Sequence, residues 1–285
     1  MRRLTDPIDQ LLILDPGRRG VARFFRPGGA LGAARALRRA RRVVITTGFA
    51  VGPGLPETDG PPGAAVLGRA LRRLGARVRY VIDTATAPAL RAVLELLGEP
   101  VAIELFPDGD ASASARRVLG RLAPTHLVAV ERPGRAADGT YRSARGHPVG
   151  AWNQPLDALF VAGSRATTVG VGDGGNEIGM GVVPRRALTA AGIPPRIASV
   201  VRVDHLVVAG VSNWGAYGIV AHLGRAGGRP LLHTPDDERR VITACVAAGA
   251  CDGVTRRREP TVDGLPLEAH AAVVTLLGVA AQARA

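Results

Sequence analysis

The sequence predicts an α/β protein with an open, mostly parallel sheet and helices on both faces, a three-layer and Rossmann-like arrangement. Short β-branched runs alternate along the chain with longer stretches rich in Ala, Leu and Arg. These runs are almost continuously apolar, as expected of parallel strands that are buried on both faces. We therefore predict one domain over residues 1–285, with residues 1–41 as an N-terminal helical extension packed on it.

The elements can be assigned in chain order. Two helices, over 5–15 and 28–40, precede the first strand. Strands are expected where β-branched residues cluster between turn residues, at Val43–Thr46, Arg77–Asp83, Val101–Phe106, His126–Glu131, Thr167–Gly172 and His205–Gly210. Helices are expected where apolar residues recur at helical spacing, at Gly63–Leu74, Ala87–Leu97, Ala111–Leu122, Asn213–Arg225, Pro235–Ala248 and Pro266–Ala283.

The basic charge of the chain does not by itself indicate a nucleic-acid partner. The formal net charge is +13, and all 37 basic residues are arginine. In the clusters Arg35–Arg42 and Gly68–Gly75, leucines keep helical spacing, so the arginines are typical of the solvated faces of amphipathic helices. We expect no nucleic-acid partner. The lack of lysine also excludes a Schiff base, pyridoxal-phosphate attachment and a P-loop lysine.

Neither a membrane segment nor a disulfide framework is predicted. No apolar run reaches the roughly 18 residues of a spanning helix, and the acids and proline near the start do not fit a signal peptide. We therefore expect a cytoplasmic protein without a membrane partner. Cys245 and Cys251 lack histidine partners nearby and are expected to be buried, free thiols.

Polar loops follow all six predicted strands. In an open parallel sheet, ligands bind where such loops meet at the carboxyl ends of the strands. The most unusual loop is "GVGDGGNEIGMG", Gly170–Gly181, with six glycines around Asp173, Asn176 and Glu177. Its glycines match a dinucleotide fingerprint only formally, because no acid follows between Ile178 and Val203 to bind a ribose. We therefore expect no nicotinamide or flavin.

Several motifs carry a resemblance to a known family. In order, "ITTGF", "ETDGPPGA", "ERPG" followed by "DGTY", "GVGDGGNEIGMG" and "SNWGAYGI" resemble the D-glutamate cyclase family, in particular its C-terminal domain. The resemblance runs from about Val43 to Ala221. It implies a lyase that converts D-glutamate to 5-oxo-D-proline plus water, formally a hydro-lyase reaction of D-glutamate metabolism. Longer relatives carry an additional N-terminal domain.

The implied reaction requires a general base, a general acid and stabilisation of a tetrahedral oxyanion. The candidate catalytic residues are Asp59, Glu131, Asp173 and Glu177, whose mutual repulsion in one cleft raises at least one pKa. Arg132 is the expected carboxylate clamp for the amino-acid substrate. The other candidates for substrate binding are loop donors and wall residues, namely Thr47, Gly48, Glu57, Thr58, Tyr141, Gly174, Gly175, Asn176, Ser212, Asn213 and Trp214.

Other interpretations remain open at this level. Asp59, Asp173, Asn176 and Glu177 offer the oxygen ligands that suit Mg²⁺ or Mn²⁺, which would indicate a metal-dependent hydrolase or lyase. The same loops also suit a non-catalytic binder of amino acids or lactams. In structural terms, residues 57–59 and Asp173 or Asn176 could cap helices, and Arg132 could pair with an acid. A homo-oligomer also stays open.

Overall fold

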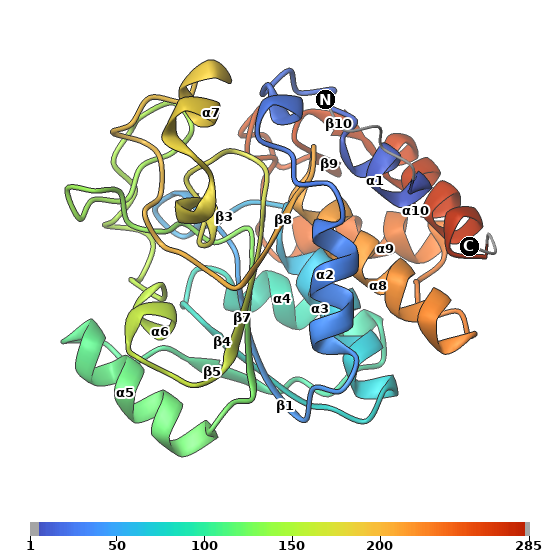
Figure 1. Ribbon diagram of the computed structural model, residues 1–285, viewed down its shortest axis with the longest axis horizontal. Helices are drawn as coiled ribbons and strands as arrows, with labels where there is room; N and C mark the ends of the chain where they lie inside the picture. Colours follow the sequence, from blue (N-terminus) through green and yellow to red (C-terminus); the bar gives the residue numbers. More distant parts are fainter. Residues whose placement is uncertain (1–5, 283–285) are drawn as a thin grey trace.

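The computed structural model describes residues 6–282, so residues 1–5 of the predicted extension and the predicted helix end at Ala283 lie outside the described residues. Within this range a six-stranded parallel sheet has the order β5-β4-β1-β6-β7-β8 (Figure 1). Its strands are β1 (Arg42–Thr47), β4 (Arg77–Ile82), β5 (Ile103–Leu105), β6 (His126–Val130), β7 (Thr167–Gly172) and β8 (His205–Val208). The predicted α/β class is confirmed.

Helices cover both faces of the sheet and form the outer layers. Figure 1 shows most of them on one side, with α5, α6 and α7 on the other. The helices are α1 (Pro7–Leu12), α2 (Gly29–Leu37), α3 (Pro61–Arg73), α4 (Ala87–Leu96), α5 (Ala111–Leu122), α6 (Ala158–Val161), α7 (Arg185–Ala190), α8 (Ser212–Gly227), α9 (Pro235–Ala247) and α10 (Leu267–Gln282).

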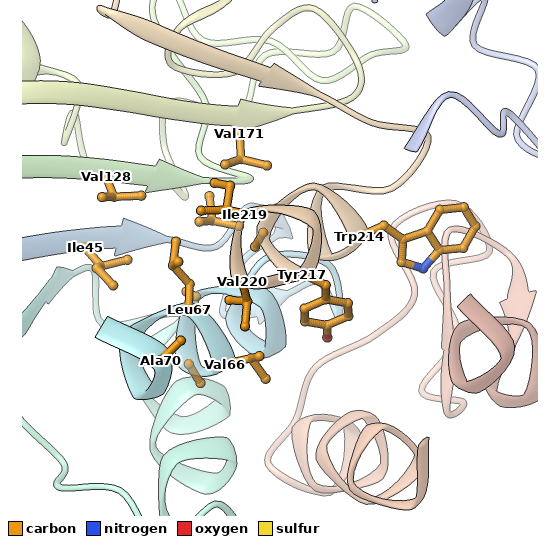
Figure 2. Close-up of a cluster of buried hydrophobic side chains, with 14 of the residues drawn as sticks. Ile45, Val66, Leu67, Ala70, Val128, Val171, Trp214, Tyr217, Ile219 and Val220 are labelled. Carbon is orange, nitrogen blue, oxygen red and sulfur yellow. The ribbon is translucent and has the colours of Figure 1, made fainter. Parts of the chain in front are cut away.

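The alternation of side chains along the strands divides the core into two sides. Along β1, Val43 and Ile45 join the large core with α3 and α8, whereas Val44 points to the opposite face, against α5 and α6. Figure 2 shows the larger core, where Ile45, Val128 and Val171 meet side chains from α3 and α8. Because both faces are buried, the strands need continuous apolar sequence, which is why they are recognisable in the sequence.

The predicted element boundaries agree closely with the structure. The ranges of β7 and α5 match the prediction, whereas β5 is shorter than predicted and β8 ends two residues early. Several short elements were not predicted: the hairpin of β2 (Ala50–Gly52) and β3 (Leu55–Pro56), the hairpin of β9 (Thr261–Val262) and β10 (Leu265–Pro266), α6, α7, and 3₁₀ turns at Val21–Arg23 and Met180–Val182. They are too short to show a periodic pattern.

The N-terminal helices pack against the C-terminal half of the chain. Helix α1 contacts α8 and α10, and α2 contacts α8 and β8. Cys245 and Cys251 are free and buried, as predicted. Over residues 6–282, no helix combines the length and the apolar character that crossing a lipid bilayer requires.

Candidate functional site

The parallel register brings the polar loops to one edge of the sheet. Thr47, Val130 and Val171 lie side by side at the ends of β1, β6 and β7. Glu131 and Asp173 follow β6 and β7 directly, and therefore emerge at the same edge. The β2–β3 hairpin returns the chain after β1 to this edge and carries Glu57 and Asp59.

A cavity of about 240 Å³ opens at this edge. It is lined by Arg19, Phe49, Val51, Glu57, Glu131, Ser143, Ala144, Arg145, Asp173, Gly174, Asn176, Glu177, Gly253, Val254, Arg256 and Asp263. Three of the four predicted catalytic acids are therefore on its wall. The fourth, Asp59, lies behind the wall, with a carboxylate oxygen within 4.8 Å of oxygens of Asp173 and Asp263.

Asp59 is held by the N-terminus of helix α8. Its carboxylate accepts hydrogen bonds from the backbone N–H groups of Ser212 at 2.9 Å and Asn213 at 2.8 Å. These are first-turn N–H groups that lack partners within the helix, and the helix dipole favours a negative charge there. Asp59 therefore does not cap α3, the helix that follows it. The N-cap of α3 is Gly60, and Asn213 Oδ1 accepts the N–H groups of Gly60 and Gly63.

Glu131 has an unusual backbone and a single side-chain partner. Its φ is 43°, in the left-handed region that non-glycine residues rarely adopt. Ser212 Oγ donates to Glu131 Oε2 at 2.5 Å. This bond fixes the carboxyl group while the residue still lines the cavity. Backbone strain of this kind is concentrated at functional sites.

The glycine-rich loop folds around the Glu177 carboxylate. The N–H of Gly174 donates to Oε1 at 2.7 Å, and the N–H of Gly175 donates to Oε2 at 2.8 Å. A Cβ on Gly174 or Gly172 would stand 2.8–2.9 Å from oxygens of Glu177, so the loop needs bare backbone to wrap this acid. The two N–H groups, predicted as donors to a ligand, are therefore occupied by Glu177. The next helical element is the 3₁₀ turn at Met180–Val182, and its N-cap is Gly179, so neither Asp173 nor Asn176 is the cap.

The sequence did not identify the charged cavity residues Arg19, Arg145, Arg256 and Asp263. Arg19 Nη1 forms an ion pair with Asp173 Oδ2, and Arg19 Nη2 pairs with Asp263 Oδ1 at 2.6 Å. Arg19 comes from the segment before α2, and Asp263 from the turn between β9 and β10. The two residues are 244 positions apart, and no local pattern distinguishes Arg19 from the other arginines of the chain. Arg145 and Arg256 also line the cavity.

Burial and mutual repulsion raise the pKa values of the acids. Burial raises the pKa of Asp59 to about 8, with the charge of Asp263 adding to the rise and the N–H groups of Asn213 and Ser212 opposing it. Burial also holds the pKa values of Glu57, Glu131 and Asp173 well above their usual range. Burial also raises the pKa of Glu177, against the opposing effect of the Gly174 N–H. The cavity therefore favours protonated carboxyl groups near neutral pH.

Arg132, the predicted substrate clamp, is not on the cavity wall. Its fully buried guanidinium forms an ion pair with Asp83 and donates to the carbonyl oxygens of Gly48 at 2.9 Å and Gln154 at 2.6 Å. These contacts tie the loops after β1, β4 and β6 together. In this structure, Arg19, Arg145 and Arg256 are the arginines available to the cavity.

Trp214 and Tyr141, the predicted pocket walls, also lie away from the cavity. Figure 2 shows Trp214 on α8 beside the buried core, and its Nε1 donates to His270 Nδ1 at 3.0 Å. Tyr141 donates its hydroxyl hydrogen to Asp157 at 2.6 Å. Both aromatic residues therefore have structural partners, because an aromatic N–H or O–H that is buried needs an acceptor.

Some of the other predicted substrate-binding residues line the cavity, and the rest lie in the structure around it. Glu57, Gly174 and Asn176 line the cavity. Thr58 donates to the carbonyl of Thr261, and Asn213 joins α8 to the loop before α3. The remaining members are also absent from the wall: Thr47, Gly48, Gly175 and Ser212.

Within residues 6–282, the carboxylates that could hold a cation form two groups, and Asp173 belongs to both. Oxygens of Asp59, Asp173 and Asp263 lie within 4.8 Å of one another, and so do oxygens of Glu131, Asp173 and Glu177. The predicted metal set contained three of these five acids. Its fourth member, Asn176, lines the cavity but directs its amide nitrogen to the carbonyl of Arg142 at 2.8 Å.

The fold and the site define a three-layer α/β protein with an acid-lined cavity at the carboxyl edge of its sheet. The chain belongs to the D-glutamate cyclase-like C-terminal family, whose model matches residues 8–278. It is 35% identical over 233 residues to human "D-glutamate cyclase, mitochondrial". That match covers 76% of this chain and 38% of the human protein, so the chain spans well under half of that relative.

Among solved structures, the chain is similar to an exopolyphosphatase-related protein from Bacteroides fragilis, with a TM-score of 0.43 and 9% sequence identity. The match covers 88% of this chain and 56% of the Bacteroides chain. It is also similar to RecJ from Thermus thermophilus, solved in complex with Mn²⁺, with a TM-score of 0.38 and 15% sequence identity. That match covers 87% of this chain and 27% of the RecJ chain.

Proposed function

We propose that the protein is a D-glutamate cyclase, a hydro-lyase that converts D-glutamate to 5-oxo-D-proline and water. The observation that supports this most directly is the combination of family membership with an acid-lined cavity that also contains arginines. Glutamate carries two carboxylates and one ammonium group. A cavity wall with both charge signs suits such a substrate, because each of its groups meets an opposite charge.

Substrate orientation is assigned to the charged residues of the wall. Arg19, Arg145 and Arg256 bind the carboxylates, and Asp173 receives the α-ammonium. Ring closure requires the α-nitrogen to approach the γ-carboxyl carbon, which is mainly an orientation problem. Because Arg19 pairs with Asp173, a carboxylate bound at Arg19 and the ammonium bound at Asp173 would lie side by side, which is the folded arrangement that ring closure needs.

Proton transfer is assigned to Glu131. The α-ammonium must lose two protons as the amide forms, and the departing oxygen must gain them to leave as water. Glu131 lines the cavity, is anchored through one oxygen by Ser212, and has a raised pKa, so in its protonated form it can deliver a proton to the leaving oxygen and then take a proton from the nitrogen. Asp59 and Glu177, each held by backbone N–H groups, keep fixed positions beside the reacting groups.

The test is NMR of the purified protein with D-glutamate, L-glutamate and 5-oxo-D-proline as separate substrates. We expect the D-substrates to interconvert and L-glutamate to remain unchanged. Glu131→Gln is expected to lower kcat at least about a hundredfold, the lower end of what a positioned acid or base contributes. The matched control is Glu268→Gln, the same chemical change at an exposed ion pair with Arg239.

Absence of lactam and of glutamate at long times, in a folded protein with and without Mg²⁺ or Mn²⁺, would exclude the proposed reaction. Saturable binding of D-glutamate without turnover would instead identify a non-catalytic binder of amino acids. Equal rates for Glu131→Gln and Glu268→Gln would show that Glu131 does not transfer the proton.

A further inference from the structure

Two groups of carboxylates in the cavity meet at Asp173. The first group is Asp59, Asp173 and Asp263, and the second is Glu131, Asp173 and Glu177. Within each group, one carboxylate oxygen of every acid lies within 4.8 Å of the others. Oxygens on opposite sides of Mg²⁺ are about 4.2 Å apart, and across Ca²⁺ they reach about 5.2 Å, twice the metal–oxygen distance in each case. Each group therefore already spans one cation, with at most a small side-chain adjustment.

The donor atoms also define the kind of cation. All five acids offer carboxylate oxygens, and neither group includes a histidine or cysteine. Carboxylate oxygens suit Mg²⁺, Mn²⁺ and Ca²⁺, whereas thiolate and imidazole ligands suit softer metals. Asp173, with two carboxylate oxygens and membership of both groups, is placed to bridge two ions.

Unpartnered oxygens supply an independent indication of a ligand. The Asp263 side chain is only 7% exposed and lines the cavity, yet within residues 6–282 its Oδ2 has no hydrogen-bond partner. Glu57, on the same wall and 7% exposed, also has a buried oxygen, Oε1, without a partner in the described part of the chain. A buried carboxylate oxygen without a donor is costly, and a cation is the strongest partner it can receive.

The charge balance of the cavity favours additional positive charge. Six carboxylates belong to the wall or to the two groups: Glu57, Asp59, Glu131, Asp173, Glu177 and Asp263. The wall has three arginines, Arg19, Arg145 and Arg256. In ionised form, the acids exceed the arginines by three charges in a region largely removed from water, and two divalent cations would compensate this excess.

Arg19 already bridges the two groups. Its guanidinium pairs with Asp173, common to both groups, and with Asp263, which belongs to only one. It therefore competes with a cation for these oxygens. If Arg19 binds a substrate carboxylate, replacing it with a neutral residue weakens substrate binding. If Arg19 competes with a metal cation, the same substitution strengthens metal binding, so measuring both separates the two roles.

We propose that the cavity binds two divalent cations, with Mn²⁺ and Mg²⁺ as the expected ions, and that Asp173 bridges them. One ion is bound by Asp59, Asp173 and Asp263, and the other by Glu131, Asp173 and Glu177. The sites concern the same cavity as the proposed function but do not rest on it. Metal binding is measured without substrate, so the failure of one proposal leaves the other untouched.

The experiment measures bound Mn²⁺ per chain after chelator treatment and equilibration with Mn²⁺ alone, by elemental analysis and by titration calorimetry. We expect two ions for the wild type and one for Asp263→Asn or Glu131→Gln. Asp173→Asn is expected to weaken binding of both ions at least about a hundredfold, beyond the loss typical of residues that only support ligands. Glu268→Gln, the same chemical change at an exposed acid outside the cavity, is the matched control and is expected to keep two ions.

Arg19→Met is expected to raise Mn²⁺ affinity at least about tenfold at low ionic strength, since it removes a competing positive charge. Thermal unfolding of each variant verifies that it is folded. If Asp173→Asn does not fold, Asp263→Asn and Glu131→Gln test the two groups separately. Fewer than two ions in the wild type at millimolar Mn²⁺, or unchanged stoichiometry in both of these variants, would overturn the proposal, and so would weaker binding by Arg19→Met.

Discussion

Glu177→Gln is expected to destabilise the protein even though it removes a negative charge from a crowded acidic cavity. Both Glu177 oxygens accept backbone N–H groups, from Gly174 and Gly175. Glutamine keeps one acceptor oxygen and turns an amide NH₂ toward the second N–H. The loss of a hydrogen bond to a charged group costs about 1.5–3 kcal/mol. Relief of the repulsion with Glu131 and Asp173 offsets only part of this cost.

The assay is thermal unfolding in chelator, together with kcat on the same preparations. We expect the Tm to fall by about 3–8 °C, since 1 kcal/mol corresponds to roughly 2–4 °C in a domain of this size. Asp173→Asn is the matched comparison. Its carboxylate accepts no backbone N–H within the described residues, and its main partner, Arg19, keeps Asp263 as a second partner when Asp173 is neutralised. We therefore expect its Tm to fall by less than that of Glu177→Gln. A Glu177→Gln protein that melts at or above the wild-type temperature would refute this reasoning, because repulsion would then outweigh the loop hydrogen bonds.

Three further outcomes follow from other contacts. Tyr80→Phe is expected to stabilise the protein by about 1 kcal/mol in urea unfolding, because the buried Tyr80 hydroxyl has no partner among the described residues; a clear loss of stability would contradict this. Burial lowers the pKa of His222 to about 4, below its unfolded value of about 6.5. The unfolded state therefore binds more protons in this window, and the wild type should lose stability relative to His222→Gln as the pH falls from about 7 to about 4; parallel pH curves of Tm would argue against a buried neutral histidine. In Gly253→Ala, the new Cβ would stand 2.0 Å from Glu57 Oε2 and move that carboxylate into the cavity, so KM for D-glutamate should rise and then recover in Gly253→Ala/Glu57→Ala. A double variant as impaired as the single one would rule out this steric route.

The sequence predicts the sheet and its main helices because their signals are local. A buried parallel strand such as β6 is apolar after its first residue and is followed by the polar residues Glu131 and Arg132. The β5 strand was predicted too long because it pairs only with β4, at the edge of the sheet. The short hairpins and α7 depend on tertiary contacts, which no periodicity records.

The contrast between local signals and tertiary contacts also explains which site residues the sequence could predict. Glu131 and Asp173 follow strands directly, so their place at the cavity follows from strand order and register, and Glu177 lies in the same glycine-rich loop as Asp173. Asp263 could not be found in this way, because an aspartate with a φ of 55° before a glycine is also an ordinary turn residue. Arg132 follows Glu131 and was therefore expected at the same site. Successive residues after a strand can point in opposite directions, and its guanidinium pairs instead with Asp83.

The acids of the cavity differ in how their oxygens are hydrogen-bonded. Some stabilise the fold through backbone N–H groups, and others have an oxygen that a ligand can bind. Asp59 and Glu177 each accept two backbone N–H groups from a neighbouring loop or helix start, so they stabilise the local structure. Glu57 and Asp263 each have a buried oxygen without a partner in the described range, and their burial therefore lowers stability. A buried carboxylate oxygen without a donor, in a group of six acids, is a local cost that the rest of the core must offset. That cost is removed when a positively charged ligand, either the substrate ammonium or a metal cation, enters the cavity.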